Sequence, residues 1–108
     1  MQSISIQFAM VDFTNPKAVL WLKSIIKDNL ITEGRAWGWM QDFGEYTPLD
    51  VTTFSKEDPS IFHNKYPEDW ARITREVQEE LGRDDIVAFM RSGNTISPRY
   101  TDLFWMGD

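Results

Sequence analysis

Apolar and polar side chains alternate at the start of the chain. The alternating apolar residues are Ile4, Ile6, Phe8 and Met10. A period of two residues is typical of a half-buried strand, and it predicts a strand over residues 3–10.

A helical period follows this first strand. Pro16 after Asn15 is typical of a helix start, because proline fits the first helical position and asparagine caps the free amides. Apolar residues at Val19, Leu22 and Ile26 then predict a helix that runs from residue 16 to about Asn29.

A second extended segment is predicted over residues 35–40. Arg35, Trp37 and Trp39 fall on one face of it, and small residues or methionine fall on the other. No period persists from residue 41 to residue 65, so this stretch is predicted to be a long loop.

The remaining pattern predicts a second helix and a buried strand. Pro67 with the acidic residues after it favours a helix start, and the apolar spacing predicts a helix over residues 67–81. Trp21 and Trp70 lie on the apolar sides of the two helices, where core positions are expected. The short apolar run 86–90 predicts a strand that is buried on both faces. The element order predicts a single α+β domain over residues 1–108.

Composition narrows the possible functions. Eleven Lys and Arg residues against seventeen Asp and Glu residues give a net charge of −6, which disfavours binding to long duplex DNA through its phosphates. The chain has no cysteine and one histidine, His63, so thiol catalysis and metal sites built from cysteine or several histidines are not expected. We predict no cofactor and no metal. The sequence shows neither a membrane span nor a signal pattern, and a cytoplasmic protein is expected.

Three segments resemble EVE-type domains of the PUA-like superfamily. The first is the opening strand over residues 3–12. The second is the helix-to-strand junction over residues 26–39, which ends in Trp37-Gly38-Trp39, and the third is the helix over residues 70–81 with the strand over residues 83–89. The family's last strands are not matched in residues 97–108.

The resemblance implies a small PUA-like or EVE-like β-barrel, mixed or antiparallel, with helices inserted between its strands. Domains of this group are similar to readers of modified bases, including those of modification-dependent restriction systems. It therefore implies a non-catalytic binding module that holds a modified or flipped nucleotide, or a short nucleic acid, in an aromatic pocket. The candidate ligand-binding residues are Trp37, Trp39, Arg35, Arg91, Ser92 and Asn94.

A second interpretation uses the acidic residues. A small acidic protein of the kind that phages use as inhibitors could bind a basic, nucleic-acid-processing protein and cover its surface. The candidate partner-binding residues are Asp42, Glu45, Asp50, Glu57 and Asp58. No nucleophile motif accompanies His63, so catalysis is not predicted. A homodimer stays open in both interpretations.

Overall fold

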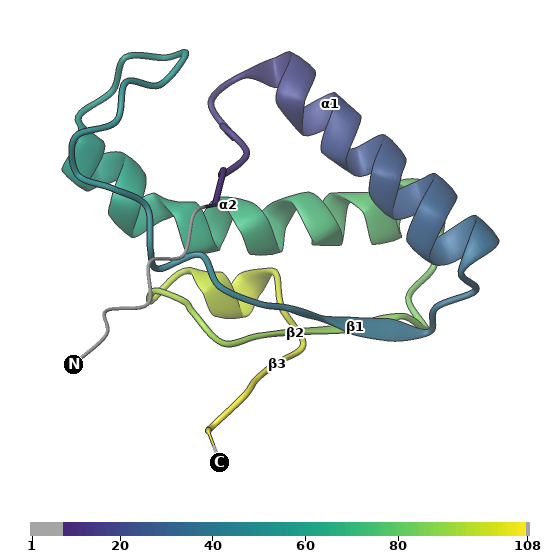
Figure 1. Cartoon of the computed structure of the whole chain (residues 1–108). Coiled ribbons are helices and arrows are strands. Elements are labelled where there is room, and N and C mark those ends of the chain that lie inside the picture. Colours follow the sequence, from purple (N-terminus) through teal and green to yellow (C-terminus); the bar gives the residue numbers. More distant parts are fainter. Residues whose placement is uncertain (1–7, 108) are drawn as a thin grey trace, which may run out of the picture.

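The computed structural model describes residues 8–107, and Figure 1 shows its arrangement. Its helices are α1 (Pro16–Ile25), the π-helix η1 (Ile26–Glu33), α2 (Pro59–Glu80) and the short 3₁₀ helix η2 (Ser97–Arg99). Its strands are β1 (Gly38–Gln41), β2 (Val87–Met90) and β3 (Leu103–Phe104).

The three strands form one sheet in the order β1-β2-β3, and both pairs are parallel. Gly38 pairs with Val87 and Gln41 with Met90, so the strand ends are in register. The expectation of an α+β fold with a mixed or antiparallel barrel is wrong, since the described strands are all parallel and helices alternate with them. Since α2 carries the chain back over the sheet between β1 and β2, β2 begins at the same edge as β1 and runs in the same direction.

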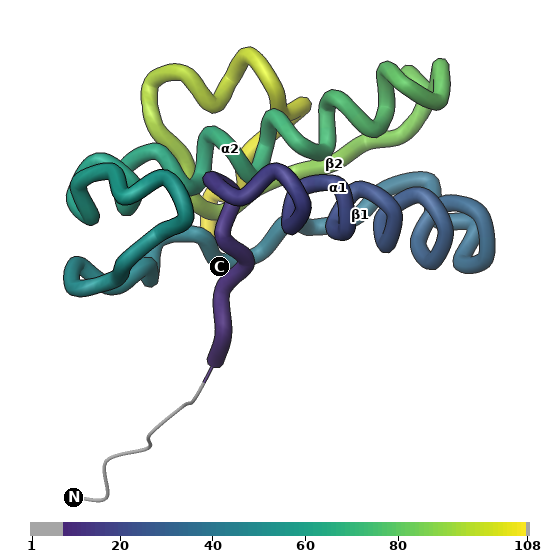
Figure 2. The backbone as a smooth tube through the Cα atoms, turned by 90° about the horizontal axis from the view of Figure 1, so that it is seen from above, coloured from purple at the N-terminus to yellow at the C-terminus, as the bar shows by residue number. Residues whose placement is uncertain are grey.

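Both long helices lie on one side of the sheet, as the views in Figures 1 and 2 agree. Ala88 and Met90 of β2 are buried, whereas Val87 of the same strand is 45% exposed. Leu103 of β3 is likewise 48% exposed. The sheet therefore has one covered face and one face with exposed apolar side chains, among the residues that the structure describes.

The first helix begins as predicted and extends further. The Asn15 side chain accepts the Lys17 N–H at 3.0 Å, so it caps α1. After Ile25 the helix continues as η1 to Glu33, beyond the predicted end. Ile26 and Ile31 of η1 are buried in the core, which explains why the helix continues.

The second helix begins eight residues earlier than Pro67. Asp58 caps it, since its side chain accepts the Ser60 N–H at 2.8 Å, and Pro59 takes the first position. Pro67 is buried inside the helix instead. The start was placed wrongly because Asp58-Pro59 and Pro67 carry the same kind of start signal, and only one of them begins the helix.

The two ends of the chain differ from the prediction in different ways. The strand predicted over residues 3–10 falls mostly outside the described residues, and residues 8–10 have no regular secondary structure. The strand predicted over residues 86–90 is present as β2, but its expected burial on both faces is wrong, since Val87 is 45% exposed. The core lies between the helices and includes Phe13, Tyr66 and Ile73. Trp70 packs against it, whereas Trp21, predicted in the core, is 57% exposed.

Candidate functional site

A charged cluster lies at the edge of the sheet where the parallel strands end. Asp42 directly follows β1, and Arg91 directly follows β2. Because parallel strands end at one edge, the crossover through α2 brings these two residues together. The Asp42 Oδ1 atom lies 3.3 Å from the Arg91 Nε atom.

Arg91 joins this aspartate to a second carboxylate. Its Nη2 atom donates to Glu45 Oε1, while Nε faces Asp42. The guanidinium carbon also lies 4.6 Å from the centre of the Phe43 ring and 5.9 Å from that of Tyr46. Both distances are within the range of a cation–π interaction. One arginine therefore fixes the side chains of most of the segment that follows β1.

The backbone of this segment adopts an uncommon conformation. Phe43 has a φ of 61°, which costs a residue with a Cβ about 1–3 kcal/mol. The Phe43 N–H donates to Asp42 Oδ1 at 2.8 Å, and the Ser92 hydroxyl donates to the Phe43 carbonyl at 2.6 Å. Gly44 follows with a φ of 112°, and a Cβ there would lie 2.7 Å from Ser92 Oγ. The turn thus depends on a glycine and on the neighbouring strand.

Glu45 has one oxygen without a partner. Its Oε1 atom accepts from Arg91, but Oε2 is buried and makes no hydrogen bond with any residue that the structure describes. A buried carboxylate oxygen normally accepts a hydrogen bond, because burial removes its water. Glu45 Oε2 is therefore a free acceptor beside Asp42.

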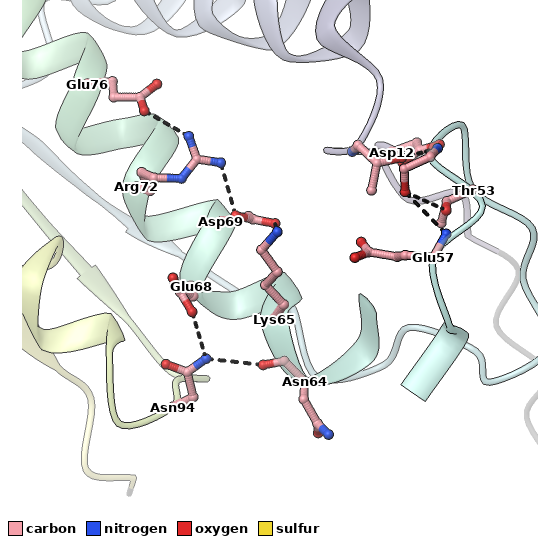
Figure 3. A network of polar contacts seen from close by, with 12 residues as sticks. Asp12, Thr53, Glu57, Asn64, Lys65, Glu68, Asp69, Arg72, Glu76 and Asn94 are labelled. Carbon is pink, nitrogen blue, oxygen red and sulfur yellow. Dashed lines mark hydrogen bonds and ion pairs between the residues drawn. The ribbon is translucent and has the colours of Figure 1, made fainter. Parts of the chain in front are cut away.

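Asn94 lies in the loop after β2 and ties that loop to α2. Its amide donates to the Asn64 carbonyl at 3.2 Å and to Glu68 Oε2 at 3.3 Å, as Figure 3 shows. Its oxygen accepts the Ile96 and Ser97 amides. Asn94 therefore holds the shape of the loop that carries Arg91 and Ser92.

The six residues predicted to bind a nucleotide do not form one site. Arg35 and Trp37 precede β1, at the edge opposite to Arg91, Ser92 and Asn94. Trp37 is 71% exposed and lies under the Arg83 guanidinium, with 5.5 Å to the ring centre. Trp39 instead packs against the core. The two indoles therefore do not line a common pocket.

The acidic residues predicted to bind a partner also divide. Asp42 and Glu45 meet on Arg91, whereas Asp58 caps α2 and Asp50 lies exposed in a turn. Glu57 is half-buried and has one buried oxygen without a hydrogen-bond partner in residues 8–107.

Two further features lie near the cluster. His63 Nδ1 is 2.6 Å from the Thr47 carbonyl oxygen, so the histidine holds the loop after β1 on α2. A hollow of about 610 Å³ adjoins the Asp42–Tyr46 segment. Its other walls are almost wholly apolar and come from residues 8–13, α1 and α2, so it offers few hydrogen-bond partners to a polar ligand.

Residues 8–107 contain neither a helix that could span a membrane nor a cluster of metal ligands. None of the helices over residues 8–107 is long and apolar enough to span a bilayer. In the same residues no group of three or more His, Asp or Glu side chains could hold a metal ion. The cytoplasmic location and the single domain over residues 1–108 stay predictions.

Parallel strands joined through helices on one face, with a charged cluster at their carboxyl edge, define a segment of a β/α-barrel enzyme. The family model of the glycosyl hydrolases family 31 TIM-barrel domain matches residues 2–108. The chain therefore belongs to glycosyl hydrolase family 31.

Named relatives agree with this family. The chain is 44% identical over 100 residues to a sulfoquinovosidase of Escherichia coli and 39% identical over 101 residues to one of Agrobacterium fabrum. Each match covers 92% of this chain and 15% of the relative. An alpha-xylosidase of Lactiplantibacillus pentosus is 39% identical over 84 residues, which cover 76% of this chain and 11% of that protein.

A solved structure shows the same fold. It is a family 31 sulfoquinovosidase from E. rectale in complex with an aza-sugar inhibitor, with a TM-score of 0.83 and 44% sequence identity. The match covers 90% of this chain and 15% of that chain. The chain thus spans about 15% of the length of the two curated sulfoquinovosidases that it matches.

These findings correct the functional predictions. The resemblance to EVE-type domains is wrong, since the chain matches a TIM-barrel domain and its strands β1 and β2 pair in parallel. Neither the non-catalytic nucleotide reader nor the acidic inhibitor is supported, and the chain belongs to a family of enzymes. The expected nucleic-acid or basic protein partner is contradicted as well, since the relatives are glycosidases.

The sequence predicts a role for Asp42, but only as part of an acidic partner-binding surface. A signal for its place existed in the sequence: an aspartate directly follows one predicted strand, and Arg91 follows the next strand across a helix. In a strand–helix–strand unit those two positions share an edge. Glu45 had no comparable signal, because the turn at Phe43 and Gly44 brings it back to Arg91.

Proposed function

We propose that this chain is the part of a glycosidase active site that supplies Asp42 as one of the two carboxylates at the scissile bond. The observation that carries the proposal is the ion pair between Asp42 and Arg91 at the carboxyl edge of the sheet. In β/α barrels this edge carries the active site, and glycosidases generally use a pair of Asp or Glu residues.

The surroundings of Asp42 suit the carboxylate that acts in its ionised form. In such a pair one carboxyl group donates a proton to the leaving oxygen, and the other reacts as a carboxylate with the sugar or with water. An ion pair with arginine uses the ionised form. Asp42 Oδ1 is held by Arg91 and the Phe43 N–H, whereas Oδ2 makes no hydrogen bond or ion pair within the described residues. Oδ2 is the atom we assign to the chemistry.

The substrate class that we propose is a glycoside of sulfoquinovose. The support is the identity of 44% and 39% to two sulfoquinovosidases, each over 92% of the chain, and of 44% to a solved sulfoquinovosidase structure. One alpha-xylosidase is 39% identical but over 76% of the chain only, and another covers 93% of the chain but is 30% identical. This part of the proposal concerns the whole protein that such a segment builds, because substrate contacts in a barrel come from several strand ends.

Segment exchange between two hosts tests both parts. This chain would replace the aligned segment in the E. coli sulfoquinovosidase and, separately, in the L. pentosus alpha-xylosidase. We expect kcat/KM to stay within about tenfold of the parent in the first host and to fall much further in the second, since misplaced catalytic groups commonly cost about a hundredfold. Asp42→Asn in the active chimera should lower kcat at least about a thousandfold.

Asp50→Asn is the matched control, since Asp50 is an exposed aspartate of the same loop. It should leave kcat unchanged. A folded sulfoquinovosidase chimera that is inactive, or one whose Asp42→Asn variant keeps its kcat, would contradict the catalytic assignment. Equal activity in the two hosts would contradict the substrate class.

A further inference from the structure

Ser92 carries a buried hydroxyl group that hydrogen-bonds to the segment next to Asp42. It is 8% exposed and lies directly after Arg91 in the loop that follows β2. Its Oγ donates to the Phe43 carbonyl at 2.6 Å, a contact between two strand ends. The proposed function does not assign any role to this hydroxyl.

The Phe43 peptide connects Ser92 to the carboxylate. The Phe43 N–H donates to Asp42 Oδ1 at 2.8 Å, so any rotation of this backbone moves the hydrogen bond that orients the carboxylate. Phe43 has a φ of 61°, a conformation that a residue with a Cβ leaves unless its surroundings hold it. The Ser92 hydroxyl is the hydrogen-bond donor at the carbonyl of this residue.

Gly44 leaves the space that this contact requires. A Cβ at Gly44 would lie 2.7 Å from Ser92 Oγ, closer than a carbon and an oxygen approach without a shift. Arg91 holds the side chains of Asp42 and Glu45 on either side of the same turn. The two consecutive residues Arg91 and Ser92 thus hold the side chains and the backbone of one segment.

We propose that Ser92 is a positioning residue for the reaction: its hydroxyl holds Phe43 in the left-handed conformation that aims Asp42 at the sugar. The inference rests on the proposed function of Asp42. Ser92 itself touches no reacting atom, and its effect passes through the Phe43 peptide. Loss of the hydroxyl should therefore lower the rate of the chemical step more than the binding of substrate.

The test is made in the sulfoquinovosidase chimera with Ser92→Ala. We expect kcat to fall about tenfold or more, because small displacements of a catalytic group are costly, while KM stays within about twofold. Ser92→Thr keeps the hydroxyl and should restore most of the rate. Ser24→Ala is the matched control, since the Ser24 hydroxyl likewise donates to a backbone carbonyl at 2.6 Å, that of Trp21 in α1, so kcat should not change.

A second measurement does not depend on activity. Hydrogen exchange followed by mass spectrometry should show faster exchange of the 42–46 segment in Ser92→Ala than in Ser24→Ala. If Asp42→Asn is inactive while Ser92→Ala keeps wild-type kcat, or if the two serine variants exchange alike, the positioning role is wrong. If Asp42→Asn stays active, the proposed function fails, and the exchange data alone then decide whether Ser92 holds Phe43.

Discussion

The carboxylate of Asp42 and the guanidinium of Arg91 lie 3.3 Å apart, although a loop and the whole of α2 separate them in the chain. The pair exists because both residues directly follow strands that run in parallel and pair in register. Its geometry depends on the arginine fork, in which Nε faces Asp42 while Nη2 binds Glu45.

Arg91→Lys should therefore impair the site although it keeps the charge. A lysine ammonium is one point charge and cannot face both carboxylates in the same way. We expect kcat/KM of the sulfoquinovosidase chimera to fall about 10- to 100-fold, an effect to be measured by steady-state kinetics. Arg99→Lys is the control, because Arg99 is exposed and makes no ion pair within residues 8–107. Equal kcat/KM values for the two variants would show that Arg91 has no role in the reaction.

A buried amide predicts a second effect, on stability. Gln41, the last residue of β1, is 1% exposed, and its Nε2 donates to the Trp70 carbonyl at 3.0 Å and to the Thr74 hydroxyl. Gln41→Met keeps the length but removes both hydrogen bonds to α2, so the free energy of unfolding should fall by about 1–3 kcal/mol. Gln41→Glu should cost more, since it buries a carboxylate against a carbonyl oxygen.

Urea denaturation of the 108-residue chain measures this loss. The double variant Gln41→Met with Thr74→Val gives the control, because it removes the Thr74 hydroxyl acceptor together with the Gln41 donor. The combined loss should then be smaller than the sum of the two single losses. Strict additivity would mean that the contact between Gln41 and Thr74 adds nothing to the attachment of β1 to α2.

Local patterns in the sequence were sufficient to predict the helix start at Asn15-Pro16 and the strand over residues 86–90. They did not distinguish Pro59 from Pro67 as the start of α2, because burial of Pro67 within the packed helix decides this point. The parallel sheet was not predicted. A helix that connects two neighbouring strands of one sheet makes them parallel, but the EVE-type resemblance implied mixed or antiparallel strands.

The candidate site was predicted only in pieces. Asp42 and Glu45 were assigned to one hypothesis, and Arg91 and Ser92 to another, yet these four residues lie together. Assembling them requires the strand register and the left-handed turn at Phe43, and neither can be read from residue types alone. The substrate could not be predicted from this sequence, because a segment that spans about 15% of its relatives carries only part of a barrel's strand ends.

The ion pairs between α1 and α2 predict how stability depends on pH. Lys23 Nζ lies 2.6 Å from Glu76 and 2.9 Å from Glu80, and Arg72 also contacts Glu76 (Figure 3). Burial alone would raise the pKa of Glu76, but hydrogen bonds from Lys23 and Arg72 outweigh it, so the pKa is lowered from its ordinary value of 4.5. The stabilisation that the ionised Glu76 side chain gives through these ion pairs is present above pH 4.5 and is lost as the pH falls through the lowered pKa.

Glu76→Gln should therefore show a shallower fall of unfolding free energy between about pH 5 and pH 3 than the unchanged chain. The difference at neutral pH should be at most about 1 kcal/mol, because the pair is partly solvated. Glu79→Gln is the matched control, an exposed glutamate of the same helix. If it alters the acid limb as much as Glu76→Gln does, the ion pairs with α1 are not the cause.

The last prediction concerns Tyr66, whose ring stacks on Phe13 at 4.3 Å and whose hydroxyl donates to the Val11 carbonyl at 3.1 Å. Burial raises the pKa of this phenol well above its ordinary value of 10. The folded chain therefore binds the phenol proton more tightly than the unfolded chain, and this stabilisation is present below pH 10 and lost as the pH rises further. Tyr66→Phe should lower the free energy of unfolding by about 1 kcal/mol at pH 7 and make its fall above pH 10 shallower.

Tyr46→Phe is the control, because the Tyr46 ring is 55% exposed. In urea denaturation at a series of pH values, it should show the same fall of unfolding free energy above pH 10 as the unchanged chain. An unaltered alkaline limb in Tyr66→Phe would show that the phenol is not buried against Val11.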